Sequence, residues 1–299
     1  MALPSKVKIV EVGPRDGLQN ESQLIEQADK VALINGLAEA NVSHIEAGSF
    51  VNPQWVPQMA DSEAVFTRIQ RKPATIYSAL VPNLQGYERA IQAGANEVAI
   101  FGAASESFTE KNINCSIKES LHRFRDVIKA AKADDIPVRG YVSCVVACPY
   151  EGAIDAAIVR DVSEQLLGMG CYEVSLGDTI GVATPADVNR LLKVLTSTIA
   201  IDKLAVHFHD TYGQALANIY AALQWGVTTI DSSVAGLGGC PYAKGASGNV
   251  ATEDVVYLLN GLSIETGIDL EKLISVGNLI SSILGKSNQS KVANAKTNR

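Results

Sequence analysis

The sequence predicts an α/β protein that folds as a closed (β/α)8 barrel with extra helices at its C-terminal end. Short runs rich in β-branched and aromatic residues alternate with longer helical patterns along the whole 299-residue chain. About eight such runs occur, at the spacing of a repeated strand–helix unit. Parallel strands joined by helices form either an open, doubly wound sheet or a barrel, and eight repeats favour closure.

The predicted elements follow one another in order along the chain. The strands cover residues 7–12, 43–48, 74–80, 97–102, 138–144, 172–177, 204–209 and 228–234. Helical periodicity lies between them, at residues 26–40, 117–133, 153–169, 185–198 and 214–225. Gly94, Gly170 and Gly226 stand at or just past the last turn of helical segments, where glycine commonly ends a helix.

No Pro-rich hinge, charge block or change in composition divides the chain. Residues 5–285 are therefore predicted to form one domain, which includes added helices near residues 269–285. Residues 286–299 are polar, and we expect them to form a flexible tail.

Composition and charge exclude several classes of protein. With 47% apolar and 19% charged residues, the chain can bury a substantial core, which excludes disorder and coiled coil. Its net charge of −7 argues against a protein that binds nucleic acid or an anionic membrane. Apolar stretches stay well short of the ~20 residues of a bilayer crossing, and the first strand follows Ser5 too closely for a signal peptide. We therefore expect a cytoplasmic protein.

The five cysteines are odd in number and sparse, which favours reduced thiols over a disulfide framework. Cys144 and Cys148 have a CxxxC spacing, but no second Cys pair or flanking His completes a zinc site. We expect these two side chains to serve in packing.

Two of the four histidines lie on the same face of the seventh predicted strand. His207 and His209 alternate with Val206 and Phe208, so the apolar residues point to the helices and the two rings point inward. Rings spaced two residues apart at the end of a strand can converge on one cation. The alternative is a pair of hydrogen-bonded interior histidines, because a short motif of this kind often arises without function.

Charged residues gather where the first, second and sixth strands end. Arg15 and Asp16 follow the first strand, Glu46 lies in the second, and Asp178 follows the sixth. The chemistry of such barrels sits at the carboxyl ends of the strands, so we expect these groups beside the two histidines. One Asp, two His and water suit Mg²⁺, Mn²⁺ or a similar divalent ion, with zinc not excluded.

Strand parity also places polar side chains inside the barrel, below the mouth. Arg139 and Tyr141 on the fifth strand and Glu173 and Ser175 on the sixth are predicted to face inward. Neighbouring strands lie about 4.8 Å apart, so we expect Arg139 and Glu173 to neutralise each other.

Residues 235–249, after the eighth strand, contain five glycines. Such a segment forms a lid, a phosphate cradle or simply a long connection. Cys240 lies where this segment could bring a thiol over the mouth, although a lone loop cysteine is often incidental. Asn249 either caps a helix that begins at Val250 or supplies a carbonyl oxygen to a metal.

Three motifs carry a resemblance to a known family. They are EVGPRDGLQN (11–20), HFHDTYG (207–213) and GGCPYAKGASGNVATE (238–253). Together they resemble the 3-hydroxy-3-methylglutaryl-CoA (HMG-CoA) lyases, which belong to metallolyase TIM barrels that also include isopropylmalate and homocitrate synthases. The resemblance runs from about Val7 to Gly285. Leu18 stands where the synthases typically carry Glu, and this favours the lyase branch.

The resemblance implies a role for particular residues. The divalent cation, Mg²⁺ or Mn²⁺, would be held by Asp16, His207, His209 and Asn249. The acyl-CoA substrate would meet Arg15, and Cys240 would act as catalytic acid, with Glu46 and Asp178 in support. Further positions expected near the substrate are Gln19, Ser49, Tyr141 and Ser175. Lys111 and Lys244 are candidates for the CoA phosphates, and family members are commonly homodimers.

The implied reaction cleaves HMG-CoA to acetyl-CoA and acetoacetate, as in leucine degradation. The metal would polarise the substrate hydroxyl, Arg15 would stabilise the enolate oxygen, and Cys240 would protonate the carbanion carbon. Either His207 or Asp178 would take the hydroxyl proton. Two alternatives remain: an acyl-CoA condensing synthase on the same barrel, and a barrel that binds CoA or metal without catalysis.

Overall fold

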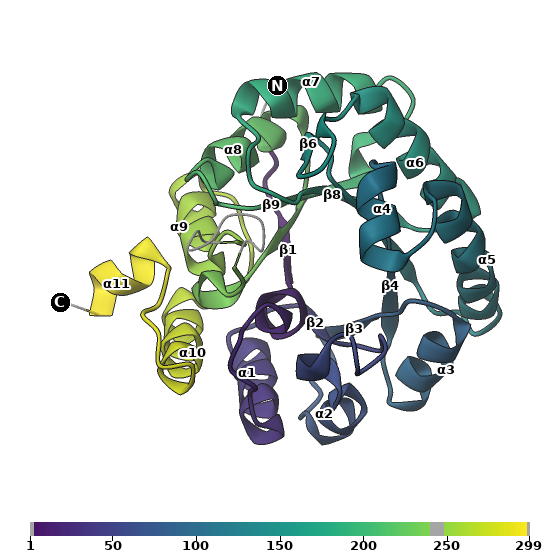
Figure 1. Cartoon of the computed structure of the whole chain (residues 1–299). Coiled ribbons are helices and arrows are strands. Elements are labelled where there is room, and N and C mark those ends of the chain that lie inside the picture. Colours follow the sequence, from purple (N-terminus) through teal and green to yellow (C-terminus); the bar gives the residue numbers. More distant parts are fainter. Residues whose placement is uncertain (1–2, 240–247, 298–299) are drawn as a thin grey trace.

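The computed structural model describes residues 3–239 and 248–297, and its long strands close into a parallel barrel, which confirms the predicted fold (Figure 1). The order around the barrel is β1-β10-β9-β8-β5-β4-β3-β2. Each strand lies inside its predicted range or extends one residue beyond it. The bounds are β1 (Lys8–Glu11), β2 (His44–Ser49), β3 (Ile76–Leu80), β4 (Glu97–Ala103), β5 (Val138–Ser143), β8 (Glu173–Asp178), β9 (Leu204–Phe208) and β10 (Thr229–Ser232).

Helices surround the barrel and cover the outer face of its strands (Figure 1). They are α1 (Gln27–Glu39), α2 (Ser62–Arg68), α3 (Leu84–Gln92), α4 (Glu106–Ile113), α5 (Ile117–Ala133), α6 (Ala156–Met169), α7 (Pro185–Leu195) and α8 (Ala215–Trp225). After the barrel come α9 (Thr252–Gly261), α10 (Leu270–Ile283) and α11 (Lys291–Thr297). The main core fills the space between strands and helices with branched side chains, for example Ile45, Val98 and Leu176.

One predicted boundary moves because local hydrogen bonds compete with the helix. Periodicity predicts a helix from residue 153, but β7 (Gly152–Ala153) pairs with β6 (Ala147–Cys148) in a small hairpin. The helix α6 then begins only after Asp155, whose carboxylate accepts a hydrogen bond from the Ala157 backbone N–H at 2.9 Å.

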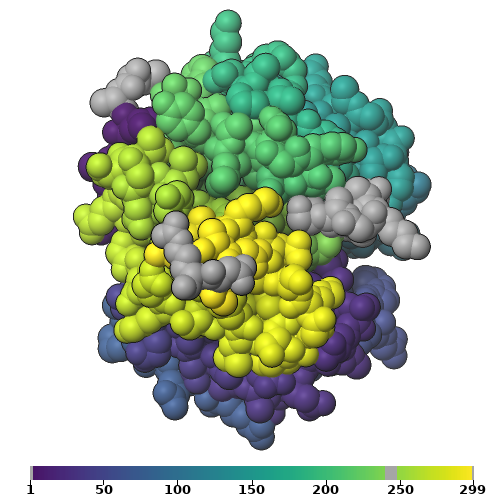
Figure 2. All heavy atoms as spheres, turned by 90° about the vertical axis from the view of Figure 1, so that its left-hand side faces the viewer, coloured from purple at the N-terminus to yellow at the C-terminus, as the bar shows by residue number. Residues whose placement is uncertain are grey.

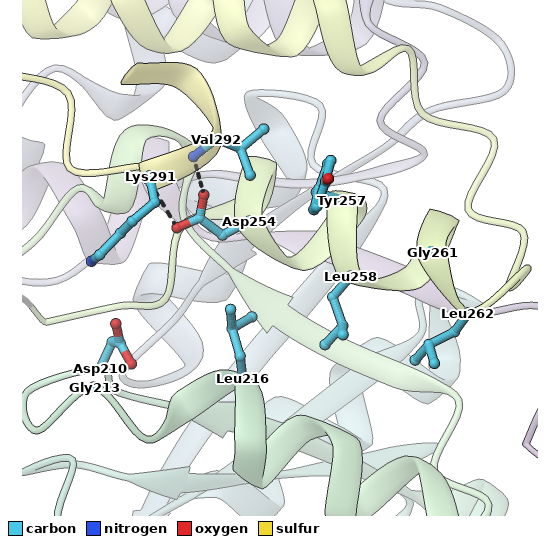
Figure 3. A pocket seen from close by; sticks show the side chains of 10 residues that line it. All are labelled: Asp210, Gly213, Leu216, Asp254, Tyr257, Leu258, Gly261, Leu262, Lys291 and Val292. Carbon is cyan, nitrogen blue, oxygen red and sulfur yellow. Dashed lines mark hydrogen bonds between the residues drawn. The ribbon is translucent and has the colours of Figure 1, made fainter. Parts of the chain in front are cut away.

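The expected flexible tail is wrong for most of residues 286–299. The Asp254 carboxylate of α9 accepts a hydrogen bond from Ser290 Oγ at 2.6 Å. It also accepts from the Val292 N–H at 2.9 Å and the Lys291 N–H at 3.2 Å (Figure 3). These bonds anchor the start of α11, and Ala293 is fully buried. The C-terminal segment therefore packs on the surface of the molecule (Figure 2). The polar composition of this segment predicted flexibility. The residue that pairs with its polar groups, Asp254, lies more than thirty residues earlier in the sequence, so the segment alone does not reveal the contact.

The barrel interior holds the ion pair expected from strand parity. Arg139 is buried and its Nε donates to Glu173 Oε1 at 2.8 Å, which confirms the predicted neutralisation. Thr229 Oγ1 donates to the other oxygen of Glu173 at 2.8 Å. Arg139 has a second acidic partner, Asp231 on β10, that the parity argument did not find.

Two further buried carboxylates tie the mouth of the barrel to α9. Glu11 accepts hydrogen bonds from the Gly13 and Val234 N–H groups and from Thr252 Oγ1, at 2.6–2.9 Å. Glu253 accepts from the N–H of Ala235, a residue held at φ +57°. Burial raises the pKa of Glu11 to about 7 and that of Glu253 to about 8.

The cysteines that the structure describes are free and buried, as expected. Cys144 and Cys148 pack with Ala103 and Phe108 in a small apolar cluster. Over the same residues, no helix combines the length and apolar character that a bilayer crossing requires.

Candidate metal centre and active site

A surface pocket of about 600 Å³ lies beside α8, α9 and α11 (Figure 3). Leu216, Leu258 and Val292 contribute apolar walls, and Asp210 and Lys291 contribute charges. None of the site residues expected from the sequence lines this pocket. The chemistry-bearing side chains gather instead at the mouth of the barrel.

Three potential metal ligands converge at the carboxyl ends of the strands. One ligand atom from each of Asp16, His207 and His209 lies within 4.8 Å of the other two. A carboxylate oxygen with two imidazole nitrogens is a donor set that suits a divalent cation. The residues present therefore fit the metal that the sequence predicts, and the two rings converge as expected.

The turn after β1 places Asp16 at this position. Residues Gly13–Gly17 form a single wide helical turn, in which the N–H groups of Asp16 and Gly17 both donate to the Val12 carbonyl. The turn packs tightly, because a Cβ at Gly17 would come within 2.7 Å of Leu237 Cβ. The GPRDG sequence thus fixes Arg15 and Asp16 on a rigid turn rather than on an open loop.

The second histidine, His209, directly follows β9, and Asn249 faces it. His209 forms an isolated antiparallel bridge with Asn249, which joins the last described segment to the mouth. The Asn249 Nδ2 donates to Asp16 Oδ2 at 2.8 Å and to the Leu237 carbonyl at 3.2 Å. The alternative role of helix cap is wrong, because α9 begins after Ala251 and no side chain caps it.

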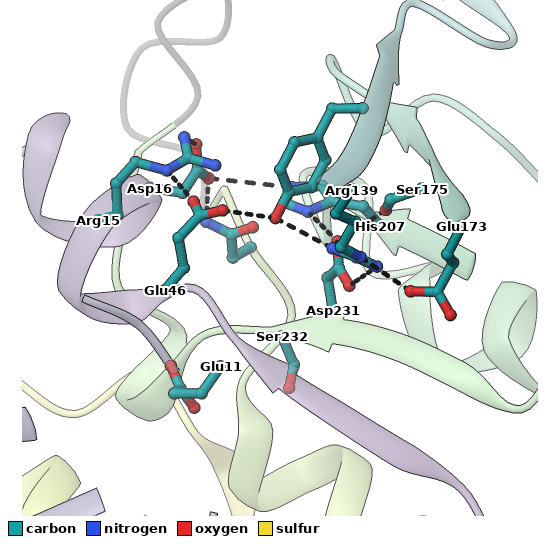
Figure 4. Close-up of polar contacts among 12 residues, drawn as sticks. Glu11, Arg15, Asp16, Glu46, Arg139, Glu173, Ser175, His207, Asp231 and Ser232 are labelled. Carbon is teal, nitrogen blue, oxygen red and sulfur yellow. Dashed lines mark hydrogen bonds and ion pairs between the residues drawn. The ribbon is translucent and has the colours of Figure 1, made fainter. Parts of the chain in front are cut away.

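Opposite charges hold Arg15 beside Asp16 (Figure 4). Arg15 Nη1 donates to Asp16 Oδ1 at 2.7 Å, and its Nε donates to Glu46. Tyr141 Oη donates to the other oxygen of Glu46 at 2.8 Å. Burial would raise the pKa of Asp16, but the positive charge of Arg15, together with His207 and the hydrogen bond from Asn249, outweighs burial and lowers that pKa to about 2.

The two imidazoles have different electrostatic surroundings. Burial and then the neighbouring His207 lower the pKa of His209 to about 4, so its ring is neutral at pH 7. Burial also opposes protonation of His207, but the hydrogen bond that its ring donates to Asp231 and the charge of Asp16 prevail and raise the pKa of His207. Neutral imidazole is the form that binds a metal.

A comparison with known proteins identifies the family of this chain. The family model described as HMGL-like matches residues 6–280. The chain belongs to the HMGL-like family.

Relatives of this family match over nearly their whole length. The 3-hydroxy-3-isohexenylglutaryl-CoA/hydroxy-methylglutaryl-CoA lyase of Pseudomonas aeruginosa is 59% identical over 295 residues, 99% of this chain and 98% of that protein. The mitochondrial hydroxymethylglutaryl-CoA lyase of Gallus gallus is 58% identical over 98% of this chain and 99% of that protein. These matches confirm the resemblance to HMG-CoA lyases.

Solved structures of HMGL-like proteins have the same fold. The crystal structure of hydroxymethylglutaryl-CoA lyase from Pseudomonas aeruginosa superposes with a TM-score of 0.98 at 58% identity, over 100% of this chain and 99% of that chain. An HMG-CoA lyase from Acinetobacter baumannii, in complex with coenzyme A and 3-methylmalate, matches with a TM-score of 0.93 at 38% identity, over 99% and 96% of the two chains.

The remaining residues expected in this HMGL-like site are distributed as follows. Gln19 Nε2 donates to Asp16 Oδ1 at 3.3 Å. Ser175 Oγ points below the cluster and donates to Asp231 Oδ2 at 2.7 Å. Ser49 is buried at the end of β2, and its Oγ has no hydrogen-bond partner among the described residues. Lys111 lies on α4 with its ammonium 3.6 Å from the Tyr150 ring centroid.

Asp178 lies at the end of β8 with its carboxylate turned toward the following loop. Its oxygens accept hydrogen bonds from the Ala183 N–H at 2.9 Å and the Val182 N–H at 3.3 Å. Burial raises its pKa to about 6. Cys240 and Lys244 lie outside the described residues.

Sequence reasoning missed Asp231, which contacts His207 directly. His207 Nδ1 lies 3.3 Å from Asp231 Oδ2, and His207 Nε2 lies 3.9 Å from Asp16 Oδ2 (Figure 4). The signal was present, because Asp231 is an acidic residue within a short, otherwise uncharged strand. Its parity with Thr229 places it inside the barrel.

Proposed function

We propose that this chain is a divalent-metal-dependent carbon–carbon lyase that cleaves HMG-CoA to acetyl-CoA and acetoacetate. The observation that carries the proposal is the convergence of Asp16, His207 and His209 beside Arg15 at the barrel mouth. Relatives named as HMG-CoA lyases, 57–59% identical over nearly the whole chain, support this reaction.

The metal would be held by Asp16, His207 and His209, with Asn249 as a fourth ligand. Asn249 presents its amide nitrogen to Asp16, and a half turn of the amide exchanges that nitrogen for the carbonyl oxygen that a cation binds. When bound, Mg²⁺ or Mn²⁺ supplies Lewis-acid polarisation of substrate oxygens.

Arg15 would bind the thioester oxygen and stabilise the negative charge that develops on it. The guanidinium is held on one edge by Glu46 and on another by Asp16, so its position is set before substrate arrives. Tyr141 orients Glu46 in turn. A fixed donor of this kind lowers the barrier because no reorganisation is needed as charge develops.

Asp178 and His207 are the two candidates for the base that takes the hydroxyl proton. We propose that Asp178 orders the loop after β8, because its oxygens accept hydrogen bonds from N–H groups of that loop. Asp178 also shares strand parity with the core residues Val174 and Leu176, which places it on the face of β8 that points away from the barrel interior. His207 is then the candidate whose ring reaches the site.

Cys240 would donate a proton to the carbanion carbon as a neutral thiol. The glycine-rich sequence around Cys240 supports this role, because such a segment can serve as a lid. Gln19 and Ser49 complete the proposed surroundings of the substrate, whereas Ser175 donates to Asp231 below the cluster.

We further propose a cytoplasmic homodimer that acts in leucine degradation with an acyl-CoA substrate. One relative at 57% identity is named cytoplasmic and comes from Mus musculus, whereas others are named mitochondrial. A solved relative at 38% identity carries coenzyme A, which supports the acyl-CoA class of substrate.

A direct assay separates the lyase from the condensing synthase and from a barrel that only binds. HMG-CoA with Mg²⁺ should release acetoacetate, and a chelator should stop the release until Mg²⁺ is returned. Release of free CoA from acetyl-CoA and a 2-oxo acid would instead support the synthase. Tight CoA binding without turnover would support the non-catalytic alternative.

A further inference from the structure

Asp231 lies directly beneath the proposed metal centre and is held from several sides. It pairs with His207 across the β9–β10 ladder, so the two side chains are neighbours on the inner face of the barrel. Arg139 donates to both of its oxygens, from Nη2 to Oδ1 at 2.7 Å and from Nη1 to Oδ2 at 3.1 Å. Ser175 Oγ also donates to Oδ2, at 2.7 Å.

These contacts leave Asp231 little freedom to rotate. A bidentate guanidinium fixes the plane of the carboxylate, and Arg139 is itself held by Glu173 and lies 5.0 Å from the Tyr141 ring centroid. Asp231 and Arg139 are both 1% exposed, so water does not compete for these bonds. The carboxylate therefore presents Oδ2 to His207 in one fixed direction.

An ionised carboxylate only accepts hydrogen bonds, so the ring nitrogen that faces it must carry the proton. His207 Nδ1 faces Asp231 Oδ2 at 3.3 Å, and Nε2 faces Asp16 Oδ2 at 3.9 Å. A neutral ring with its proton on Nδ1 has its lone pair on Nε2, directed at the cluster.

We propose that Asp231 is the positioning residue that sets the tautomer and orientation of His207, so that Nε2 is available to the cation. This inference rests on the proposed ligand set. It adds a role that does not require Asp231 to touch substrate or metal.

The competing explanation is that Asp231 only balances the charge of Arg139. Glu173 provides a matched control, because it accepts a hydrogen bond from Arg139 Nε at 2.8 Å and belongs to the same buried network. Unlike Asp231, it has no contact with His207 among the described residues. If Asp231 only balances charge, Glu173→Gln and Asp231→Asn should change the His207 tautomer and the Mn²⁺ affinity equally. If Asp231 positions His207, only Asp231→Asn should change them.

The test uses the metal-free full chain labelled with ¹⁵N-histidine, together with Mn²⁺ titration followed by electron paramagnetic resonance. The chain has four histidines, so single-histidine variants can assign the spectrum. Above the pKa of His207, the unsubstituted protein should show His207 with its proton on Nδ1. A proton on Nε2 would overturn the inference even if no variant folds.

Asp231→Asn should shift His207 toward the other tautomer and weaken Mn²⁺ binding by roughly 10–100-fold. Glu173→Gln should leave the tautomer unchanged and Mn²⁺ binding within about 3-fold, since changes remote from the ligands act weakly. Equal effects of the two variants, or an unchanged tautomer in Asp231→Asn, would overturn the inference. Retained Mn²⁺ binding in His209→Ala would overturn the ligand set itself, which separates the two failures.

Discussion

Replacement of Arg15 by Lys tests the proposed chemistry without removing the positive charge. The guanidinium donates through Nη1 to Asp16 and through Nε to Glu46, which leaves Nη2 for the substrate. A lysine ammonium is a point charge on a flexible stem and cannot hold both carboxylates while it also meets a thioester oxygen. The variant should therefore lose one donor that acts on the developing oxyanion.

Loss of one such donor costs about 3–4 kcal/mol of transition-state stabilisation, which corresponds to a fall in kcat of roughly 10²–10³-fold. Mn²⁺ affinity should change little, because Arg15 contacts Asp16 Oδ1 whereas Oδ2 is the oxygen that faces His207. The assay is acetoacetate release at saturating HMG-CoA, with Mn²⁺ titration and circular dichroism on the same preparation.

Arg123→Lys is a suitable control, because this exposed arginine forms its ion pair with Glu119, one helix turn away on the surface. It should match the unsubstituted protein in turnover and in metal binding. Near-normal turnover in Arg15→Lys would refute the placement of Arg15 at the reacting oxygen. Loss of Mn²⁺ binding in parallel with turnover would show that Arg15 acts through Asp16 instead.

Three further changes probe separate parts of the site. His209→Ala should lower Mn²⁺ affinity at least 10-fold in titration, because it removes one of three converging ligands, and unchanged affinity would exclude His209 as a ligand. Cys240→Ser should lower kcat with little change in Tm or metal affinity, because a hydroxyl is a far weaker acid than a thiol; full activity would remove Cys240 from the mechanism. Glu253→Gln should flatten the dependence of stability on pH. The pKa of Glu253 is about 8 in the fold against 4.5 ordinarily, so the native state binds more protons and the free energy of unfolding falls as pH rises between these values. Urea unfolding at pH 5 and pH 8 measures the free energy of unfolding of both proteins. The same change in this free energy between the two pH values for Glu253→Gln and for the unsubstituted protein would contradict the prediction.

The barrel was predictable because hydrophobic parity is a local signal. Val206 and Phe208 point to the helices and His207 points inward, because successive side chains of a strand alternate between its two faces. This alternation does not depend on contacts with distant residues. The same rule placed Arg139 and Glu173 inside, and the observed 2.8 Å ion pair follows from their adjacent strands. Location at the carboxyl ends of strands then grouped Asp16 with the histidines.

The parts that sequence reasoning missed depend on contacts between distant residues. Asp231 meets His207 only because β10 pairs with β9 in one particular register, which no single strand reveals. The C-terminal residues were predicted to be flexible because their partner, Asp254, lies on a different helix and the local sequence does not reveal the hydrogen bonds between them. The cap proposed for Asn249 failed for a similar reason, since Asp16 binds its amide instead.

The most direct test of the central claim is anomalous diffraction from crystals soaked in Mn²⁺. A single strong peak should lie ~2.0–2.6 Å from a carboxylate oxygen of Asp16 and from one ring nitrogen each of His207 and His209. A peak at other residues would contradict the proposed metal centre. The absence of a peak at Asp16, His207 and His209 in a protein whose turnover Mn²⁺ supports would contradict it as well.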